Sequence, residues 1–330
     1  MSPSTTEIIV NEVSQCLDEG QLDQAIAQLD LALQEDPTNA RLLYMKGCAH
    51  ADSGQLEDAI AAYESSATHG GEKAVNPLYN LANLYKEIDD FPNAVATFNK
   101  VLQLDPSLCD AWINLGCILD DHKHHATALE CYDTALRIDD QDPMTWANRG
   151  NSLRALDRLE EAEKCYRKAL ELDEDNMASA VGLGGCMVER GDVEGLVLLD
   201  QAYESTQHPT VLFELATAFA KLERYADALQ SYDQLINDGM ENSSLWNNRG
   251  ECLAKMNRAE EALLSFDRAI AEDADFEAAY FGKARVLHNL DRYEEAKPIV
   301  AQLLAVASEE FKASPGVRAL VTLSMATGEV

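Results

Sequence analysis

Two stretches of the chain decide its fold: WINLGCILDDHKHHATALECYDTALRID (residues 112–139) and WANRGNSLRALDRLEEAEKCYRKALELD (residues 146–173). They begin 34 residues apart and agree at fixed positions, where Trp, Asn, Gly, Ala, Cys and Tyr recur, while most charged positions differ. Carried outward with small insertions and deletions, this register places Trp112, Trp146 and Trp246 in one slot, which we number position 4. The apolar and small residues recur with a fixed period, whereas the charged residues differ. This indicates that the sequence specifies how the helices pack and leaves the outer surface free to vary.

The repeating unit has the pattern of a helical hairpin. Positions 4, 7, 8 and 11 have the spacing of one helical face, and positions 20, 24 and 27 mark a second helix. A short turn between them carries Gly54, Asp157 or Asn257 in different units. Position 8 is usually Gly or Ala and position 24 is usually aromatic, so two helices can cross closely beside a large ring. Position 20 is Ala in most units: Ala25, Ala59, Ala94, Ala128, Ala162, Ala228, Ala262 and Ala296.

This pattern resembles the tetratricopeptide repeat superfamily. The resemblance covers about nine units over residues 6–308 and implies an all-α, right-handed superhelical solenoid of helix-turn-helix repeats. It also implies that the first helices line a concave groove that binds a peptide or a partner protein. We expect residues 1–5 to be disordered, and we expect residues 309–330 to form a C-terminal capping helix and tail over the last apolar face.

Three irregularities interrupt the register. THGG, residues 68–71, adds one residue between the second and third units. The sixth unit, about residues 177–208, is short and rich in glycine, and the register places Leu196 in the Ala slot and Asp200 in the aromatic slot. It is therefore a degenerate repeat that we expect to act as a hinge. Pro298 lies within the second helix of the ninth unit, where proline should kink or delay the helix.

The composition limits the classes of partner. The 330 residues include 58 acidic and 26 basic side chains, for a formal net charge of −32. This field repels nucleic acid and anionic membranes and favours a basic protein or peptide partner, although acidity can also serve solubility alone. The N-terminal sequence does not resemble a secretory signal, and no apolar run approaches the length of a membrane span. The eight cysteines, without a C-x-x-C pair, are expected to be buried, reduced core thiols of a cytoplasmic protein.

The sequence lacks the usual signatures of catalysis. It contains no phosphate-binding loop, H-E-x-x-H, G-x-S-x-G or dinucleotide motif, so we expect no enzymatic activity and no cofactor. The cluster DDHKHH, residues 120–125, has side chains that can ligate zinc or nickel. Its place in the turn between two helices favours a solvated turn instead.

The candidate binding residues lie on the first helices, at positions expected to face the groove. Asparagines at position 6 of successive units form a ladder of amides that should be open to solvent and able to pair, as donors and acceptors, with an extended peptide backbone. This is similar to the asparagine ladder in the superhelix of O-linked N-acetylglucosamine transferase, but no transferase domain follows in this chain. The alternative is that asparagine is merely common and solvated at this position. The predicted groove residues are Asn80, Asn83, Lys86, Asn114, Asn148, Asn151, Arg154 and Asn248.

A second tetratricopeptide device, the clamp for the acidic tails of heat-shock chaperones, uses Lys at position 5 and Asn at position 9, then Asn at position 6, then Lys at position 2 and Arg at position 6, in three successive units. Here the matching positions hold Tyr79 and Asn83, then Asn114, then Met144 and Asn148. The sequence therefore predicts a non-catalytic protein-interaction scaffold that does not bind acidic chaperone tails. Such a scaffold would act as an adaptor, an assembly factor or a co-chaperone-like protein. The alternative is a self-assembling structural scaffold, a homo-oligomer formed through the array ends or the tail helix.

Overall fold

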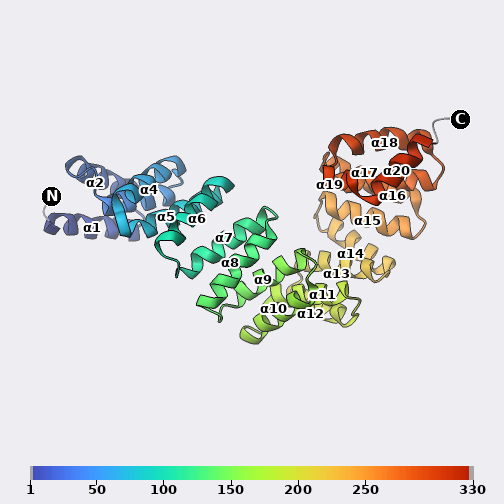
Figure 1. Ribbon diagram of the computed structural model, residues 1–330, viewed down its shortest axis with the longest axis horizontal. Coiled ribbons are helices and arrows are strands. Elements are labelled where there is room, and N and C mark those ends of the chain that lie inside the picture. The colour runs from blue at the N-terminus through green and yellow to red at the C-terminus, as the bar shows by residue number, and fades with distance from the viewer. Residues whose placement is uncertain (1–2, 327–330) are drawn as a thin grey trace. The chain divides into compact units, whose positions relative to one another are not determined.

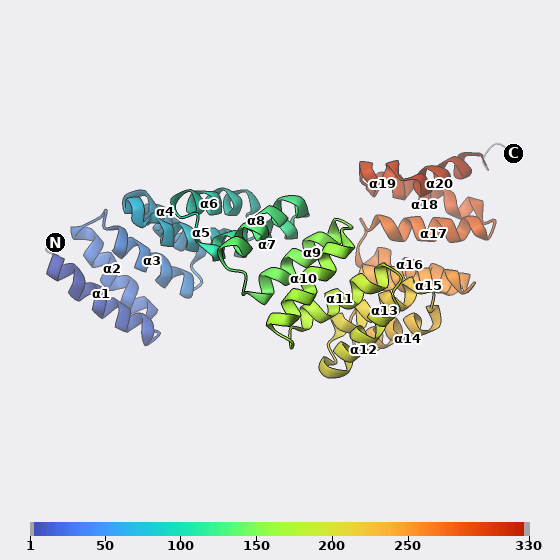
Figure 2. The same ribbon diagram turned by 60° about the horizontal axis from the view of Figure 1, so that its bottom comes forward.

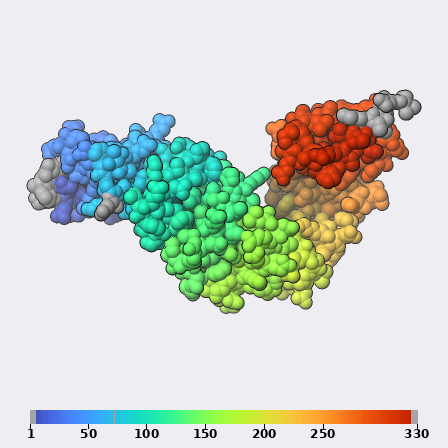
Figure 3. Space-filling view, in the orientation of Figure 1, coloured from blue at the N-terminus to red at the C-terminus, as the bar shows by residue number. Residues whose placement is uncertain are grey.

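A computed structural model describes residues 3–326, and its regular elements there are helices that pack in consecutive pairs (Figures 1 and 2). The chain divides into two compact units, residues 1–174 (unit 1) and residues 175–330 (unit 2). Within each unit the colour changes in chain order over the surface (Figure 3), because each hairpin packs against its neighbours in sequence. The all-α fold of paired helices predicted from the register is confirmed.

Unit 1 contains α1 (Pro3–Asp18), α2 (Leu22–Glu35), α3 (Ala40–Asp52), α4 (Leu56–Gly70), the 3-10 turn η1 (Gly71–Ala74), α5 (Val75–Glu87), α6 (Phe91–Leu104), α7 (Cys109–Asp121), α8 (His125–Ile138), α9 (Pro143–Ala155) and α10 (Leu159–Leu172). Unit 2 contains α11 (Met177–Glu189), α12 (Glu194–Thr206), α13 (Pro209–Lys221), α14 (Tyr225–Asn237), α15 (Ser243–Lys255), α16 (Ala259–Glu272), α17 (Glu277–Asn289), α18 (Tyr293–Val306), α19 (Glu309–Ala313) and α20 (Pro315–Ala326).

The two helices of a hairpin cross where the sequence has its small residues. A Cβ atom added to Gly116 would lie 2.6 Å from Cε1 of Tyr132, and one added to Gly150 would lie 2.7 Å from Cε1 of Tyr166. Both rings are fully buried, as is Ala128 at position 20. Since ordinary carbon contacts are about 3.5–4.0 Å, glycine at position 8 makes room for the ring at position 24. The predicted roles of positions 8, 20 and 24 are confirmed in these hairpins.

The turn inside each hairpin needs a left-handed residue. The backbone φ angle is +75° at Gly54, +59° at Asp157 and +61° at Asn257, the residue types expected in such turns. Lys123 and Glu223 occupy the same turn position with φ of +63° and +60°. Since a side chain with a Cβ atom strains this conformation, the turn is set by the flanking helices and not by its own residue.

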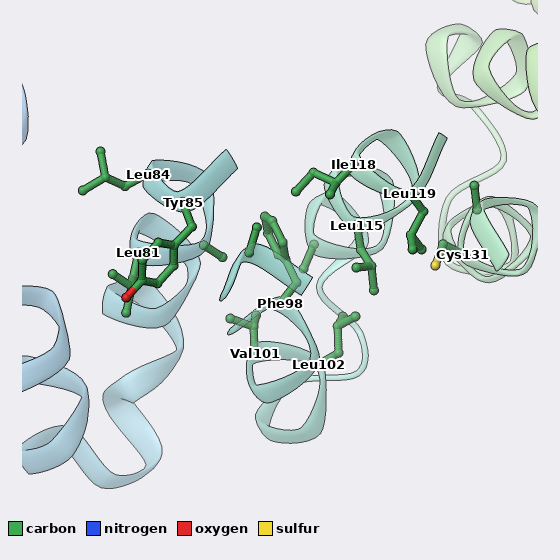
Figure 4. Close-up of a cluster of buried hydrophobic side chains, with 14 of the residues drawn as sticks. Leu81, Leu84, Tyr85, Phe98, Val101, Leu102, Leu115, Ile118, Leu119 and Cys131 are labelled. Carbon is green, nitrogen blue, oxygen red and sulfur yellow. The ribbon is translucent and has the colours of Figure 1, made fainter. Parts of the chain in front are cut away.

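Stacking of successive hairpins completes the core. In unit 1, Phe98 and Leu102 of α6 lie between α5 and α7 and pack with Leu81 and Leu115 (Figure 4). Phe98 is fully buried, although it belongs to a two-layered hairpin that could not cover it alone. The apolar face of a second helix is thus closed by the next first helix, which is the physical basis of a repeat array.

Some charges also recur with the repeat. An aspartate of one second helix pairs with a basic residue 16 positions later, on the next first helix. These charges are therefore not free to vary as the opening comparison of two repeats suggested. The N–O distances are 2.6 Å for Lys46–Asp30, 2.6 Å for Arg149–Asp133, 2.7 Å for Arg249–Asp233 and 2.5 Å for Lys283–Asp267.

The tryptophans at position 4 hold the loop that precedes their helix. The indole Nε1 of Trp112 donates to the carbonyl of Pro106, and that of Trp146 donates to the carbonyl of Asp140, both at 2.9 Å. In unit 2, the buried Nε1 of Trp246 has no hydrogen-bond partner among the described residues. Gly239, with φ of +86°, gives the loop before α15 a different course.

The sixth repeat keeps its close crossing, but one residue earlier than the register placed it. Gly195 packs against the backbone of Gly184, and Leu199 is fully buried beside it. Asp200 is exposed. The assignment of Leu196 and Asp200 to the Ala and aromatic slots was wrong, because Gly195 follows Gly184 by 11 positions, whereas Ala162 follows Gly150 by 12 positions in a regular hairpin. The hinge stays a prediction.

The other irregularities are accommodated locally. The extra residue of THGG is taken up by η1, where Gly71 has φ of +57°. Helix α18 continues through Pro298, which lies in its second turn, so only one backbone hydrogen bond near the helix start is lost.

The two ends differ from the expected boundaries. Helix α1 begins at Pro3, a residue suited to the first helical position, so residues 3–5 are helical where disorder was expected. Residues 1 and 2 lie outside the described part. The expected C-terminal cap is divided into α19 and α20, and Val317 and Leu320 of α20 pack with Tyr280 and Leu303. Residues 327–330 of the expected tail also lie outside it.

Candidate functional site

The predicted groove residues fall on four first helices. Asn80, Asn83 and Lys86 lie on α5, Asn114 lies on α7, and Asn148, Asn151 and Arg154 lie on α9, all in unit 1. Asn248 lies on α15 in unit 2. The structure therefore brings seven of the eight residues onto successive first helices of one compact unit, and places the eighth in the other unit.

Three position-6 amides of unit 1, on α5, α7 and α9, are bonded to the preceding repeat and are half-buried. In each case the Nδ2 group donates to a tyrosine hydroxyl or a cysteine sulfur on the previous first helix. We expected these amides to be open to solvent, and this was wrong, because the neighbouring helix supplies an acceptor for each of them. The pairs are Asn80 with Tyr44 Oη at 3.2 Å and with Cys48 Sγ at 3.8 Å, Asn114 with Tyr79 Oη at 2.9 Å, and Asn148 with Cys117 Sγ at 3.6 Å.

These bonds fix which side of each amide remains available. With Nδ2 directed at the preceding repeat, the Oδ1 atoms of Asn80 and Asn148 have no hydrogen-bond donor within residues 3–326. Oδ1 of Asn114 accepts from Nζ of Lys86, at 3.5 Å. The ladder therefore presents acceptors, one of which already binds a cation, and not the mixture of donors and acceptors that the sequence predicted.

The other predicted residues have varied surroundings. Oδ1 of Asn151, which is exposed, accepts from the hydroxyl of Tyr166 at 2.7 Å. Asn83 is half-buried on α5, and Arg154 is half-buried one turn after Asn151. In unit 2, Oδ1 of Asn248 accepts from Nδ2 of Asn247 at 3.4 Å.

Sequence reasoning missed the tyrosines at position 5. The ring of Tyr44 lies 6.0 Å from that of Tyr63, and the ring of Tyr79 lies 6.0 Å from that of Phe98, edge-on. Burial raises the pKa of Tyr44, so its hydroxyl stays protonated at neutral pH. The aromatic character of position 5 in successive units was the available signal, since such a residue can support a polar neighbour on the next helix.

Three of the eight cysteines are not core thiols. Cys48, Cys109 and Cys117 are half-buried, which corrects the expectation that all eight are buried. Cys48 and Cys117 occupy position 9 and accept from the ladder amides. All eight are free thiols.

The histidine-rich turn is packed against an aromatic ring. His122 stacks on Phe91 with ring centroids 4.0 Å apart, and His124 stacks on the same ring at 5.6 Å. Nδ1 of His125 lies 2.9 Å from Oδ1 of Asp120. Over the described residues, no three His, Cys, Asp or Glu side chains are grouped so as to hold a metal ion. None of the helices described there is long and apolar enough to cross a membrane.

Comparison with known proteins gives the family. Models of the tetratricopeptide repeat match residues 17–70, 75–108, 109–142, 143–176, 213–275 and 253–328, which together exceed half of the chain. The chain belongs to the tetratricopeptide repeat superfamily. The matches leave out residues 177–212, where the sixth repeat lies. Tetratricopeptide repeats bind protein partners, so this member is a protein-interaction scaffold.

Solved structures show the same fold. The crystal structure of yeast Tom70 shares 15% identity over 97% of this chain and 88% of that chain, with a TM-score of 0.55. A tetratricopeptide repeat protein from Parabacteroides merdae shares 17% identity over 85% of this chain and 98% of that chain, with a TM-score of 0.50. MamA shares 25% identity over 52% of this chain and 92% of that chain, with a TM-score of 0.48. No curated protein matches the chain. For Tom70 and the Parabacteroides merdae protein, with TM-scores of 0.55 and 0.50, the likeness is one of fold.

Proposed function

We propose that this tetratricopeptide repeat protein is a non-catalytic scaffold that holds an extended segment of a partner protein against the first helices of unit 1. The observation that carries the proposal is the fixed orientation of the ladder amides. Asn80, Asn114 and Asn148 are each tied to the preceding repeat through Nδ2, at 3.2, 2.9 and 3.6 Å. Preorganised acceptors lose little conformational freedom on binding, which favours affinity.

The spacing of the ladder suits an extended chain. Neighbouring packed helices lie about 8–10 Å apart, and an extended chain advances about 3.3 Å per residue. One amide therefore falls beside about every third residue of a bound segment. The acceptors Oδ1 of Asn80 and Asn148 can take backbone N–H groups, which every residue except proline supplies. Such binding is tolerant of side-chain sequence.

The charge of unit 1 favours a basic segment. Residues 1–174 contain 32 acidic and 13 basic side chains. Several of the basic residues are already paired within the unit, among them Lys46 and Arg149. The remaining field attracts cationic partners at a distance and weakens as salt is added.

The test begins by identifying a partner through affinity capture and mass spectrometry, and then measures binding by calorimetric titration. Replacing Asn80, Asn114 and Asn148 together with Ala should weaken binding by about 3 kcal/mol, roughly a hundredfold, if about 1 kcal/mol per amide adds. Asn99→Ala, which removes an exposed amide from α6, is the matched control and should bind as the wild type does.

The structure changes the expected stability of this triple variant. Because each amide bonds to the preceding repeat, its loss should also destabilise unit 1 by about 0.5–1.5 kcal/mol per site. Binding is therefore measured well below the melting temperature, with folding checked by circular dichroism. A folded triple variant that binds with wild-type affinity would show that the ladder is not the binding surface.

The rival function, a self-assembling scaffold, is favoured by apolar side chains at the start of the array. Ile8 and Leu31, in the first hairpin, are 58% and 65% exposed. Size-exclusion chromatography with light scattering separates the two functions. A defined oligomer that dissociates on Leu31→Glu substitution would support self-assembly, whereas a monomer supports the binding scaffold.

A further inference from the structure

A pocket lined by several polar side chains opens at one end of the asparagine ladder. It has a volume of about 270 Å³ and lies within unit 1, between the last turns of α7, the hairpin partner α8 and the next first helix α9. Two predicted groove residues, Asn148 of the ladder and Asn151, line it. The rest of the lining comes from Cys117, Asp120, Asp121, His125 and Tyr132.

One carboxylate of the pocket is held in place by its neighbours. Oδ2 of Asp120 accepts from the hydroxyl of Ser152 at 2.6 Å, and Oδ1 lies 2.9 Å from Nδ1 of His125. Only 19% of the Asp120 side chain is exposed. Because its contacts come from α8 and α9, this carboxylate is a fixed acidic wall and not a solvated side chain.

Two acceptors of the pocket have no donor. The amide of Asn148 donates to Cys117, which leaves its Oδ1 unpaired. Asp121 is exposed and has neither a hydrogen bond nor an ion pair within residues 3–326. The pocket therefore offers two unpaired acceptors, and Nδ2 of Asn151, which has no acceptor within residues 3–326, is a donor beside them.

The residues around the pocket are also mainly acidic. Residues 105–142, which include α7 and α8, contain nine acidic and two basic side chains. One of those basic residues, Arg137, is on the surface of α8 and bonds to Thr134. A cation entering the pocket would therefore gain from fixed acceptors and from the local field together.

We propose that this pocket binds the guanidinium group of an arginine from the bound segment. A guanidinium has five N–H donors in one plane, which suits a cavity edged by carboxylate and amide oxygens on different helices. The inference rests on the proposed function, since it names the side chain that would anchor a segment lying along the ladder. In this proposal the pocket selects an arginine side chain of the bound segment. The ladder binds the backbone of the same segment whatever its other side chains are.

The experiment uses single amino acids as probes, so it needs no identified partner. Full-length protein carrying ¹⁵N-labelled asparagine is titrated with Nα-acetyl-arginine amide and, separately, with Nα-acetyl-citrulline amide, its neutral isostere. The arginine probe should shift the side-chain amide signals of Asn148 and Asn151 saturably. The citrulline probe should leave them in place, because it lacks the charge that the carboxylates select.

Matched variants locate the site. Asp121→Asn should weaken binding of the arginine probe by about three- to fivefold, the upper part of the range expected for one exposed ion pair. Asp110→Asn removes the same charge from α7 but outside the pocket, and it should change the affinity less than twofold. Equal shifts with both probes, unchanged binding in Asp121→Asn, or equal losses in the two variants would overturn the proposal.

The two proposals can fail separately. Absence of arginine binding would remove the specificity pocket but would not affect partner binding by the ladder, which the triple asparagine variant tests. Conversely, a triple variant with normal partner affinity would remove the ladder, and the arginine titration of the wild-type protein would still report on the pocket.

Discussion

A single methyl group at Gly116 should destabilise the fourth hairpin. In most helices Gly→Ala is stabilising by about 0.5–1 kcal/mol, because alanine loses less backbone entropy on folding. At Gly116 the new Cβ would lie 2.6 Å from Cε1 and 2.8 Å from Cζ of Tyr132. The sign of the effect therefore depends on whether that ring can move.

The packing around Tyr132 indicates that it cannot. Its side chain is 1% exposed, and its hydroxyl donates to Cys117 Sγ at 3.5 Å. Relief of the contact requires a shift of about 1 Å in the ring or in the helix backbone, since ordinary carbon contacts are 3.5–4.0 Å. Overpacking of this kind costs about 1–3 kcal/mol. After the gain in helix propensity, we expect a net loss of about 1–2 kcal/mol.

The assay combines urea unfolding, followed by circular dichroism, with hydrogen exchange over residues 109–138, because repeat arrays can open locally. Gly70→Ala is the control: its Cβ would meet Ala74 at 3.6 Å and Ala40 at 3.9 Å, both ordinary contacts, so at the last residue of α4 the substitution should be neutral or stabilising by up to about 1 kcal/mol. In a Tyr132→Leu background, where Cε1 and Cζ are absent, Gly116→Ala should become neutral or stabilising. A stabilising effect of Gly116→Ala in the wild-type background would refute the packing argument.

Three further predictions test other features of the fold. Trp112→Phe should cost about 1 kcal/mol more than Trp246→Phe in urea unfolding, because only the first removes a formed hydrogen bond; equal costs would contradict this. Lys123→Gly should stabilise unit 1 by about 0.5–1 kcal/mol by relieving a φ of +63°, and a lower melting temperature would show that the turn is unstrained. If the sixth repeat is a hinge, amide exchange over residues 180–200 should exceed that of its flanks. Buried Cys186 should then react with iodoacetamide faster than Cys131, whose pKa burial raises to about 12, and equal rates for the two thiols would remove the hinge.

The helix crossings and turns within each hairpin could be predicted from the sequence, because the residues that determine them lie within one repeat. Glycine or alanine at position 8, alanine at position 20 and an aromatic residue at position 24 define a helix crossing within 34 residues. The pairs Gly116–Tyr132 and Gly150–Tyr166 are therefore readable without any knowledge of other repeats. The same holds for the turns at Gly54 and Asp157, whose residue types tolerate a positive φ.

The atoms that the candidate binding surface presents could not be predicted in the same way, because they depend on contacts between repeats. The sequence placed Asn80, Asn114 and Asn148 on one face, but it could not show that Nδ2 of each amide is bonded to the preceding helix. Which half of an amide remains free is decided by an acceptor about 31–36 residues away, on the preceding hairpin.

The sixth repeat shows the same limit for packing. There the register assigned Leu196 and Asp200 to the core, whereas Gly195 and Leu199 occupy it. A shift of one residue turns a helical side chain by about 100°, so an error too small to alter the periodicity exchanges buried for exposed positions. Sequence determined that this chain forms hairpins and where each helix crosses its partner in the regular repeats. Only the tertiary structure decided which polar atoms the stacked hairpins leave unpaired, because hydrogen bonds and burial between repeats depend on how the surfaces of two hairpins meet.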